Sequence, residues 1–454
     1  MSVAVADAYI PPMPAIPDRP ISKWQSLLRS RGDLLSLFSR EDFEHQVMSL
    51  RLLARRLLVA NNPETVRDVF VLRHDIYQRK SSIVEQALRP VIGDSYFISH
   101  GPDWERRRAA LAPLLHPSEL GRFHPIMVDV AEDMAERWLA AGDRPFDVAL
   151  EMAAANATVI IRCLTGTPFP IERAVPLAAA FGTFQRRIGN SDFLDMLGFP
   201  AWTPRPHSLT ALIMARRIKK IAEDLIAAAS PDTGMIARMR AILGDDGQPL
   251  LDAEQLRNEV CTMMLAGFEG SANVQAWTWF LLSQHRDSAA TVSGELARVL
   301  GGRAPAPEDL AALPFTRALL NETMRLYPPV SFLARQAMKP DRIRRWDVTP
   351  GTVIVAIPWL LHRHSRLWKA PHAFHPERFL GTAARSVPKF AYIPFGVGPR
   401  VCSGAAFGMN EMMIMTAVLA QRVRVGLLPG SRVMPRCRLT LRPMGGIPMR
   451  AAPI

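Results

Sequence analysis

Apolar residues recur at three- and four-residue spacing through most of residues 21–330, as in 212–228. This spacing places them on one face of an α-helix, so most of the stretch is predicted to be helical. After Pro328-Pro329 the pattern changes to short β-prone runs such as 353–357, and helical spacing returns at 404–423. The chain is therefore predicted to be mainly α with small β-sheets.

Five prolines, at positions 11, 12, 14, 17 and 20, occur in the first twenty residues. A proline has no amide donor and restricts the residue before it, so residues 1–20 are predicted to form an extended arm. Residues 21–454 are predicted to form a single domain. A composition of 48% hydrophobic and 21% charged residues is enough to bury a large core.

The sequence carries no clear signal for a membrane or for cross-linking. No run reaches the roughly 18 consecutive apolar residues of a membrane helix, and residues 1–10 lack the features of a secretory signal. We therefore expect a cytoplasmic protein without a membrane span. The cysteines are too far apart in the sequence for a close-paired metal site, and a disulfide framework is not expected in a reducing compartment. They are Cys163, Cys261, Cys402 and Cys437.

The formal charge of +13 is compatible with nucleic acid, an anionic membrane or an acidic protein as partner. The arginines occur in short clusters, such as 106–108, without interleaved aromatic residues. Solvated surface faces explain such clusters best, so a nucleic-acid-binding role is not expected.

One cysteine has surroundings that favour chemistry. Cys402 lies in a glycine-rich segment, 395–404, immediately before the predicted helix at 404–423. Gly398 and Gly404 permit close backbone approach, so amide hydrogens can point at the sulfur, and the N-terminus of the following helix favours a thiolate. A buried structural cysteine is the commoner alternative for an arbitrary glycine turn.

The segment resembles the haem-binding loop of the cytochrome P-450 family, Phe-x-x-Gly-x-Arg-x-Cys-x-Gly, at every specified position. The resemblance implies haem b, iron protoporphyrin IX, with the Cys402 thiolate as metal ligand, which favours O–O cleavage. It also implies the cytochrome P-450 fold, with haem between a long central helix and the helix that follows the cysteine. Haem-binding positions implied in this segment are Phe395, Gly396, Arg400 and Gly404.

Two further elements of the family occur in the expected order. Glu322 and Arg325 are three residues apart and can pair on a helix. With Arg378 they match the Glu-Arg-Arg triad, which implies a buried network that holds the cysteine loop. Trp104 and Arg108 match the Trp-x-x-x-Arg element. Together with Arg335 and Arg400 they are implied to bind the haem propionates, because a guanidinium fits a carboxylate; singly, each arginine is more often a surface charge.

Residues 253–283 are predicted to form one helix of roughly 45 Å, at about 1.5 Å per residue. Within it, the segment 266–271 resembles the oxygen-activation motif Ala-Gly-x-(Asp/Glu)-Thr-Thr, which implies that Ala266 and Gly267 contact haem. Gly270 stands where the first threonine is expected, and this departure bears directly on proton delivery.

Glu269 and Ser271 remain as polar candidates for catalysis beside Gly270. Ser271 could replace the threonine if the two glycines loosen the helix, with its hydroxyl bonded to the Gly267 carbonyl. Each glycine costs up to about 1 kcal/mol inside a helix, which favours such a loosened turn. Alternatively, a substrate hydroxyl or water fills the gap, or the reaction tolerates weak proton delivery, as in peroxide-driven turnover.

The resemblance implies an oxygenase with an apolar substrate pocket. Residues 266–268 are implied to line the pocket, as are Val330, Ser331, Phe332 and Leu333, and their character favours a hydrophobic substrate. The expected reaction is reductive activation of dioxygen and insertion of one oxygen atom. Alternatives are a peroxygenase, a rearranging or isomerising haem-thiolate enzyme and, remotely, a haem sensor without catalysis.

The resemblance also implies an external electron source, because the chain ends soon after the final sheet region. We expect an acidic ferredoxin or flavodoxin with an NAD(P)H reductase, and a monomeric enzyme. Basic residues predicted to border the docking face are Arg106, Arg107, Arg363, Arg366, Lys369 and Lys389. The histidines at 362, 364, 372 and 375 could be imagined as zinc ligands, but 362–364 falls on a family element, so they are predicted to be structural.

Overall fold

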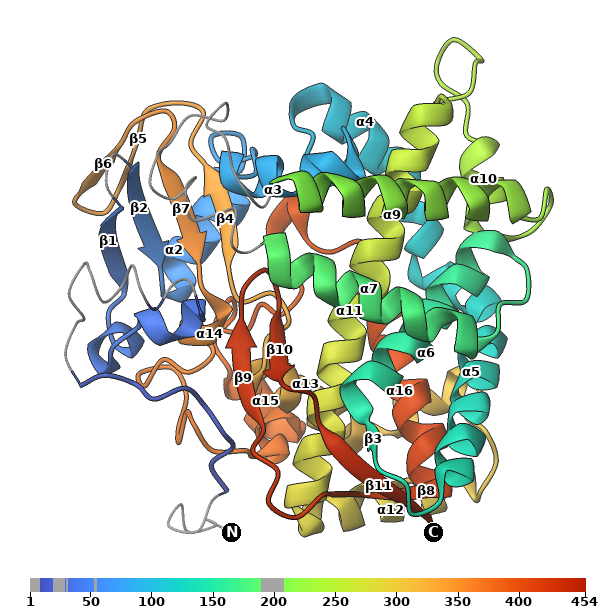
Figure 1. Ribbon diagram of the computed structural model, residues 1–454. Helices are drawn as coiled ribbons and strands as arrows, with labels where there is room; N and C mark the ends of the chain where they lie inside the picture. Colours follow the sequence, from blue (N-terminus) through green and yellow to red (C-terminus); the bar gives the residue numbers. More distant parts are fainter. Residues whose placement is uncertain (1–8, 19–28, 30–31, 53–54, 189–207) are drawn as a thin grey trace.

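The computed structural model describes all residues except 1–8, 19–28, 30–31, 53–54 and 189–207. Helices make up most of the molecule (Figure 1). Their bounds are α2 Pro63–Arg67, α3 Ser82–Ile92, α4 Gly101–Leu111, α5 Leu120–Ala141, α6 Val148–Thr165, α7 Ile171–Ile188, α9 Ser208–Ala228, α10 Gly234–Arg240, α11 Ala253–Gln284, α12 Arg286–Leu300, α13 Pro314–Leu326, α14 Pro358–Leu361, α15 Gly381–Ser386 and α16 Ala405–Arg422.

Four small sheets complete the described fold, in the strand orders β1-β2-β7-β4, β3-β11-β8, β5-β6 and β9-β10. The strands are β1 Val47–Leu52, β2 Arg55–Ala60, β3 Phe146–Asp147, β4 Leu333–Gln336, β5 Asp341–Ile343, β6 Trp346–Val348, β7 Val353–Ala356, β8 Val423–Leu427, β9 Met434–Cys437, β10 Leu441–Met444 and β11 Pro448–Pro453. The predicted fold class, mainly α with small sheets, is confirmed.

The largest sheet lies beside the helices rather than between them (Figure 1). β2 and β7 pair in parallel and β7 is buried along its whole length, which explains its continuous apolar sequence. β4 begins at Leu333, a few residues after α13 ends. Its pairing with β7 therefore helps to position residues 330–333.

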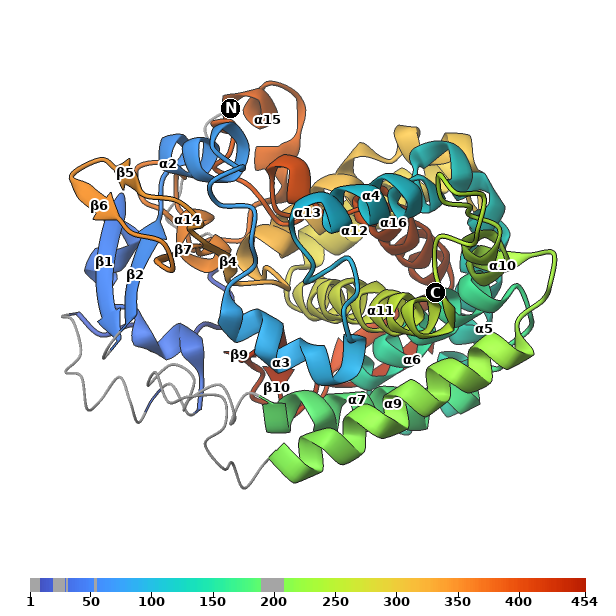
Figure 2. The ribbon, with the colours of Figure 1, turned by 90° about the horizontal axis from the view of Figure 1, so that it is seen from above.

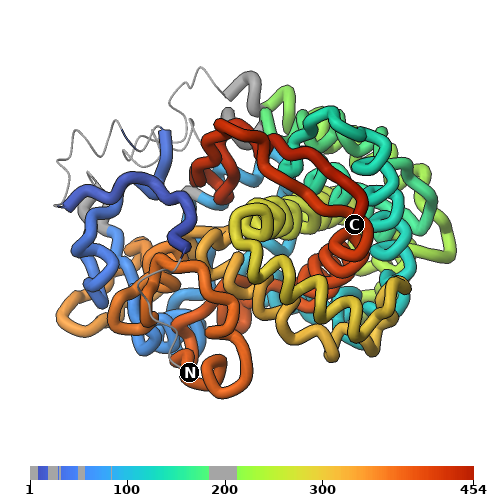
Figure 3. Tube along the Cα trace, turned by 90° about the horizontal axis from the view of Figure 1, so that it is seen from below, coloured from blue at the N-terminus to red at the C-terminus, as the bar shows by residue number. Residues whose placement is uncertain are grey.

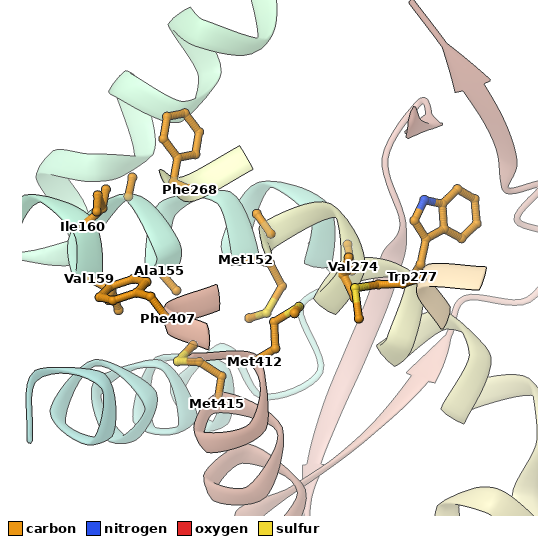
Figure 4. Close-up of a cluster of buried hydrophobic side chains, with 14 of the residues drawn as sticks. Met152, Ala155, Val159, Ile160, Phe268, Val274, Trp277, Phe407, Met412 and Met415 are labelled. Atoms are coloured by element: carbon orange, nitrogen blue, oxygen red, sulfur yellow. The ribbon is translucent and has the colours of Figure 1, made fainter. Parts of the chain in front are cut away.

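α11 is the longest described helix, and Figure 2 shows it passing through the middle of the helical part. Its first turn is closed by a capping box in which Asp252 accepts from the Gln255 amide and Gln255 accepts from the Asp252 amide. Apolar side chains from α6, α11 and α16 pack together around it (Figure 4). The predicted long helix is confirmed, at Ala253–Gln284.

Residues 9–18 contain no helix or strand and run along the outside of the molecule (dark blue in Figure 3). The Tyr327 hydroxyl donates to the Pro12 carbonyl, and the Phe374 amide donates to the Tyr9 carbonyl. The predicted start of the domain near residue 21 lies outside the described residues. Among described helices, α6 is long and apolar enough to cross a membrane, but 78% of that window is buried inside the protein, as in a core helix.

Candidate haem-binding site

The cysteine loop, residues 395–404, leads directly into α16. The Cys402 amide donates to the Phe395 carbonyl at 2.9 Å, which closes the loop just before α16 begins. Gly398 has a positive φ of 76°, and a Cβ there would lie 1.9 Å from the Phe70 carbonyl oxygen. The loop therefore needs glycine at this position so that its backbone can pass the π-helical turn at Asp68–Leu72.

Cys402 is exposed as a residue although other parts of the protein surround its sulfur. Burial of the sulfur raises the pKa of the thiol. The Gly404 backbone amide, Arg108 and Lys80 oppose that rise, so each favours the thiolate. The Gly404 contribution agrees with the expectation that a backbone amide points at the sulfur, whereas the contributions of Arg108 and Lys80 to the thiolate were not predicted.

Three predicted haem-binding residues meet beside this loop, where α4 lies next to the start of α16 (Figure 2). The Arg108 guanidinium donates to the Val401 carbonyl at 2.7 Å and to the Ser403 hydroxyl at 3.3 Å. The Arg400 guanidinium stacks 4.3 Å from the buried Trp104 ring and donates to the Ser99 carbonyl. These contacts set the three side chains beside Cys402.

Arg335 and Lys80 add positive charge at the same place. Burial lowers the pKa of Arg335 to about 10, and burial followed by the charges of Arg335 and Arg108 lowers the pKa of Arg400 to about 9. The pKa of Lys80 falls well below its ordinary value, through burial and through repulsion from the three arginines. Lys80 was not predicted from the sequence, because an isolated lysine matches no motif.

The site fits the group that the resemblance implies. Four cations crowd together, and the Arg400 Nε atom has no hydrogen-bond partner among the described residues. Such crowding is unfavourable unless an anion binds there, since each positive charge destabilises the others. A metal-containing molecule with two carboxylates would neutralise these cations, and the Cys402 thiolate could ligate the metal. Haem has both features.

The predicted triad is buried and paired. Arg325 forms two hydrogen bonds of 2.7 Å to the two Glu322 carboxylate oxygens, and Arg378 donates to Glu322 at 3.1 Å. Glu322 and Arg325 have no exposed side-chain surface. Arg325 also donates to three backbone carbonyls in the segment 362–373. The network thus ties α13 to the chain that leads into the cysteine loop.

His362 carries this connection onward. Arg325 donates to its carbonyl at 2.9 Å, while its ring Nε2 accepts from the Ile393 amide at 2.9 Å. Ile393 in turn accepts from the Gly396 amide in the cysteine loop. Burial lowers the pKa of His362 to about 3, which keeps the ring neutral and able to accept. No group of three or more His, Cys, Asp or Glu side chains among the described residues is placed to hold a metal ion.

The oxygen-activation segment lies in an unbroken helix. Ala266 is exposed in an otherwise largely buried stretch, and a Cβ on Gly270 would meet no atom within 4 Å. Gly267 differs, because a Cβ there would lie 2.7 Å from Ile160 of α6. The structure therefore explains the glycine at 267 by packing against α6, and its predicted haem contact stays a prediction. Continuity of α11 through both glycines contradicts the loosened turn.

Ser271 faces α16. A Cβ built on Gly408 would lie 3.2 Å from its hydroxyl, and its hydroxyl lowers the pKa of Glu411. Burial of Glu411 outweighs that contact and raises the pKa of its carboxyl to about 8. Ser271 therefore lies close to the buried Glu411, but both Glu411 carboxylate oxygens lack a hydrogen-bond partner among the described residues. No described contact joins Ser271 to the Gly267 carbonyl.

The proposed pocket residues divide between surface and core. Val330 is exposed, Leu333 begins β4, and Phe332 is partly buried 6.1 Å from the Phe38 ring. Ser331 is wholly buried and donates to the Pro328 carbonyl, which directs its hydroxyl into the protein.

Phe268, also expected to line the pocket, packs against Phe181 of α7, with ring centroids 5.0 Å apart. It also borders an apolar cavity of about 300 Å³ between α6, α7, α9 and α11. The expectation that Phe268 lines the substrate pocket stays a prediction.

Two residues of the expected docking face are also placed differently. Arg107 is buried and pairs with Asp103 and Glu259. Arg363 is buried, with its guanidinium 3.6 Å from the Trp359 ring. Both are removed from the predicted surface patch. The exposed members are Arg106, Arg366, Lys369 and Lys389.

Comparisons with known proteins agree with this arrangement. The family model "Cytochrome P450" matches residues 17–446. Cyclooctatin synthase of Streptomyces melanosporofaciens is 29% identical over 87% of this chain and 86% of its own length. Cyclooctat-9-en-7-ol 5-monooxygenase of the same organism is 28% identical over 85% of this chain and 83% of its own. The crystal structure of the cytochrome P450DA heme domain superposes with a TM-score of 0.78 at 20% identity, covering 90% of both chains.

Proposed function

This chain belongs to the cytochrome P450 family, and from that membership we propose that it is a haem-thiolate monooxygenase of an apolar organic substrate. One observation carries the proposal. An accessible cysteine thiol lies close to four crowded cations, so the protein offers a metal ligand and positive charge for two carboxylates. When bound there, haem would supply the iron at which dioxygen is activated.

The proposed reaction balances as one substrate C–H group, dioxygen, two electrons and two protons giving one alcohol and water. The electrons come from NAD(P)H through a reductase and an acidic ferredoxin or flavodoxin. Arg106, Arg366, Lys369 and Lys389 are exposed and provide positive charge for such a donor. Glu269 is proposed to move protons, because it is the acidic residue beside the open space at Gly270.

An apolar substrate is supported by the exposed side chains near the site. Ala266 and Val330 are accessible hydrophobic residues, and Phe332 is partly so. One relative is named for oxidation of cyclooctat-9-en-7-ol, whose name denotes an unsaturated alcohol. We propose a substrate that is mainly hydrocarbon, for a cytoplasmic monomer with an arm at 1–20 and one domain at 21–454.

Replacement of the cysteine tests this function. Cys402→Ala should abolish the red-shifted carbon monoxide difference band and all NAD(P)H-driven substrate oxidation. Cys261→Ala is the matched control, because that buried thiol lies in α11 outside the cysteine loop, and it should keep the band. Survival of the band in Cys402→Ala would refute the ligand assignment. Labelled dioxygen should place one oxygen atom in the wild-type product.

Peroxygenase chemistry is a second candidate, favoured by glycine at 270. Without a hydroxyl there, delivery of protons to reduced dioxygen is poorly supported, whereas hydrogen peroxide already contains both reducing equivalents and both protons. Product yield with hydrogen peroxide, compared with yield from reduced ferredoxin and dioxygen, separates the two reactions. A much higher yield with peroxide would replace the monooxygenase proposal.

A further inference from the structure

A β-hairpin near the end of the chain contacts the acidic residue of the oxygen-activation segment. β9 and β10 pair from Cys437↔Leu441 to Met434↔Met444, so Thr440 lies in their connection. The Arg442 guanidinium donates to Glu269 Oε1 through Nε at 2.7 Å and through Nη2 at 2.5 Å. The Thr440 hydroxyl donates to the same oxygen. Three donors from one hairpin thus converge on one carboxylate atom.

The second carboxylate oxygen is left without a hydrogen bond. No described residue donates to Glu269 Oε2, although the residue is only 6% exposed. Gly270, the next residue, has open space where a side chain would begin. A carboxylate fixed through Oε1 keeps Oε2 able to accept a proton from water and to donate it again.

The hairpin itself is firmly held. The Cys437 amide donates to Asp33 Oδ1 at 2.8 Å, and Arg436 donates to the Gly32 carbonyl at 2.7 Å. Near the other end, the Leu441 amide donates to the Pro329 carbonyl at 2.9 Å. The three Glu269 donors therefore project from a fixed element, and Glu269 gains its orientation from outside α11.

We propose that Arg442, assisted by Thr440, is a positioning residue that holds Glu269 by Oε1 so that Oε2 moves the protons of oxygen reduction. The inference rests on the proposed monooxygenase function and deepens it. In a chain with glycine at 270, no neighbouring helix hydroxyl at that position can orient the acid, so the hairpin does so instead. The guanidinium also supplies the counter-charge that a buried carboxylate needs.

Loss of this orientation has a measurable product. When protons do not reach the correct oxygen atom, dioxygen takes up two electrons and two protons and leaves as hydrogen peroxide, and the substrate is not oxidised. Arg442→Gln should raise peroxide formed per NADH consumed several-fold and alter the solvent deuterium isotope effect on NADH consumption. Arg442→Lys should restore part of the coupling. These assays use the holoenzyme with a surrogate ferredoxin, its reductase and an apolar compound that shifts the haem spectrum.

Arg450→Gln is the matched control, because it removes an exposed guanidinium from β11, outside the hairpin. It should leave coupling unchanged. Glu269→Gln should uncouple the enzyme, and Arg442→Gln should add little to it, since both changes remove one function. Additive effects, or unchanged peroxide in Arg442→Gln, would overturn the proposal.

A second measurement does not need turnover. Hydrogen exchange of the ferric enzyme, followed by mass spectrometry, should stay as slow in residues 434–444 of Arg442→Gln and Glu269→Gln as in the wild type, because other contacts hold the hairpin. Faster exchange of the hairpin in both variants would show that the hairpin depends on Glu269, and would overturn the proposal that a fixed hairpin orients the acid. If the wild-type enzyme instead consumes no NADH with any apolar ligand, the proposed function fails, while the exchange result still reports whether the hairpin is fixed.

Discussion

Single residues in the cysteine loop are constrained by contacts that motif matching does not explain. Gly396 and Gly398 both have positive φ angles, of 74° and 76°. They differ in space, because a Cβ on Gly396 would meet nothing within 4 Å, whereas one on Gly398 would overlap the Phe70 carbonyl. Backbone conformation alone therefore explains Gly396. At Gly398 the close approach of two backbone segments is a second requirement for glycine.

Replacement of these glycines should separate the two effects. Gly396→Ala should cost about 1 kcal/mol or slightly more, through the positive φ. Gly398→Ala should cost much more, since the Cβ can fit only if the loop or the Asp68–Leu72 turn moves. Haem retention and the carbon monoxide difference band, measured in both variants against temperature, check the prediction. Equal losses would show that the Phe70 contact is unimportant.

Glu411 makes stability depend on pH. Its carboxyl pKa is raised by burial to about 8, above the ordinary value of 4.5. Below about pH 4.5 the Glu411 carboxyl is protonated in the folded and in the unfolded protein. Between about pH 4.5 and about pH 8 it ionises only in the unfolded protein, so the free energy of unfolding falls as the pH rises.

Glu411→Gln should remove this contribution. The free energy of unfolding of the variant minus that of the wild type should increase by about 1.4 kcal/mol per pH unit between about pH 5.5 and about pH 7.5. Above that range the difference should become constant. Urea unfolding of the two proteins across this range provides the measurement. A constant difference at all pH values would exclude a raised pKa at this position.

Among elements, the segments with strong local signals were predicted and those joined across the fold were not. The helix at 253–284 has a capping box and a long apolar pattern, so both its existence and its bounds were predictable. The Glu322–Arg325 pair was predictable for the same reason, because its members lie on one helix.

Lys80 and Arg442 were missed because each reaches the site only through tertiary structure. Arg442 meets Glu269 across 173 residues of sequence. The neighbours of Ser271 and Phe268 were not predictable for a related reason. Helical spacing gives the face of a helix, but the packing of α7 and α16 determines what each face meets.

The triad is the element-scale connection whose loss should be most severe. Arg325→Met would leave Glu322 charged and buried with only Arg378 to neutralise it, so about 3–5 kcal/mol should be lost. Lys220→Met is the control, because Lys220 and its partner Asp224 are both largely exposed, and such exposed pairs contribute about 0–1 kcal/mol. Urea unfolding and haem content should both separate these variants. Similar stability of the two would refute a structural role for the network.

At the scale of the whole molecule, the charge of +13 acts at long range. Dissolved ions screen protein charges beyond about 10 Å at 0.1 M salt. Attraction of an acidic electron donor should therefore weaken steeply as the salt concentration increases. Burial of Arg107 and Arg363 leaves Arg106, Arg366, Lys369 and Lys389 as the exposed members of the proposed docking face. The total charge therefore matters less than where its exposed part lies.

Charge reversal tests this local effect. Lys369→Glu should slow reduction by an acidic ferredoxin at low salt and flatten its salt dependence, because one attractive charge becomes repulsive. Arg216→Glu, an exposed position on α9, changes the total charge equally and should reduce the rate far less. Stopped-flow reduction at increasing ionic strength measures both. Equal effects of the two substitutions would mean that net charge alone governs the encounter, and a rate independent of salt would exclude an electrostatic docking face.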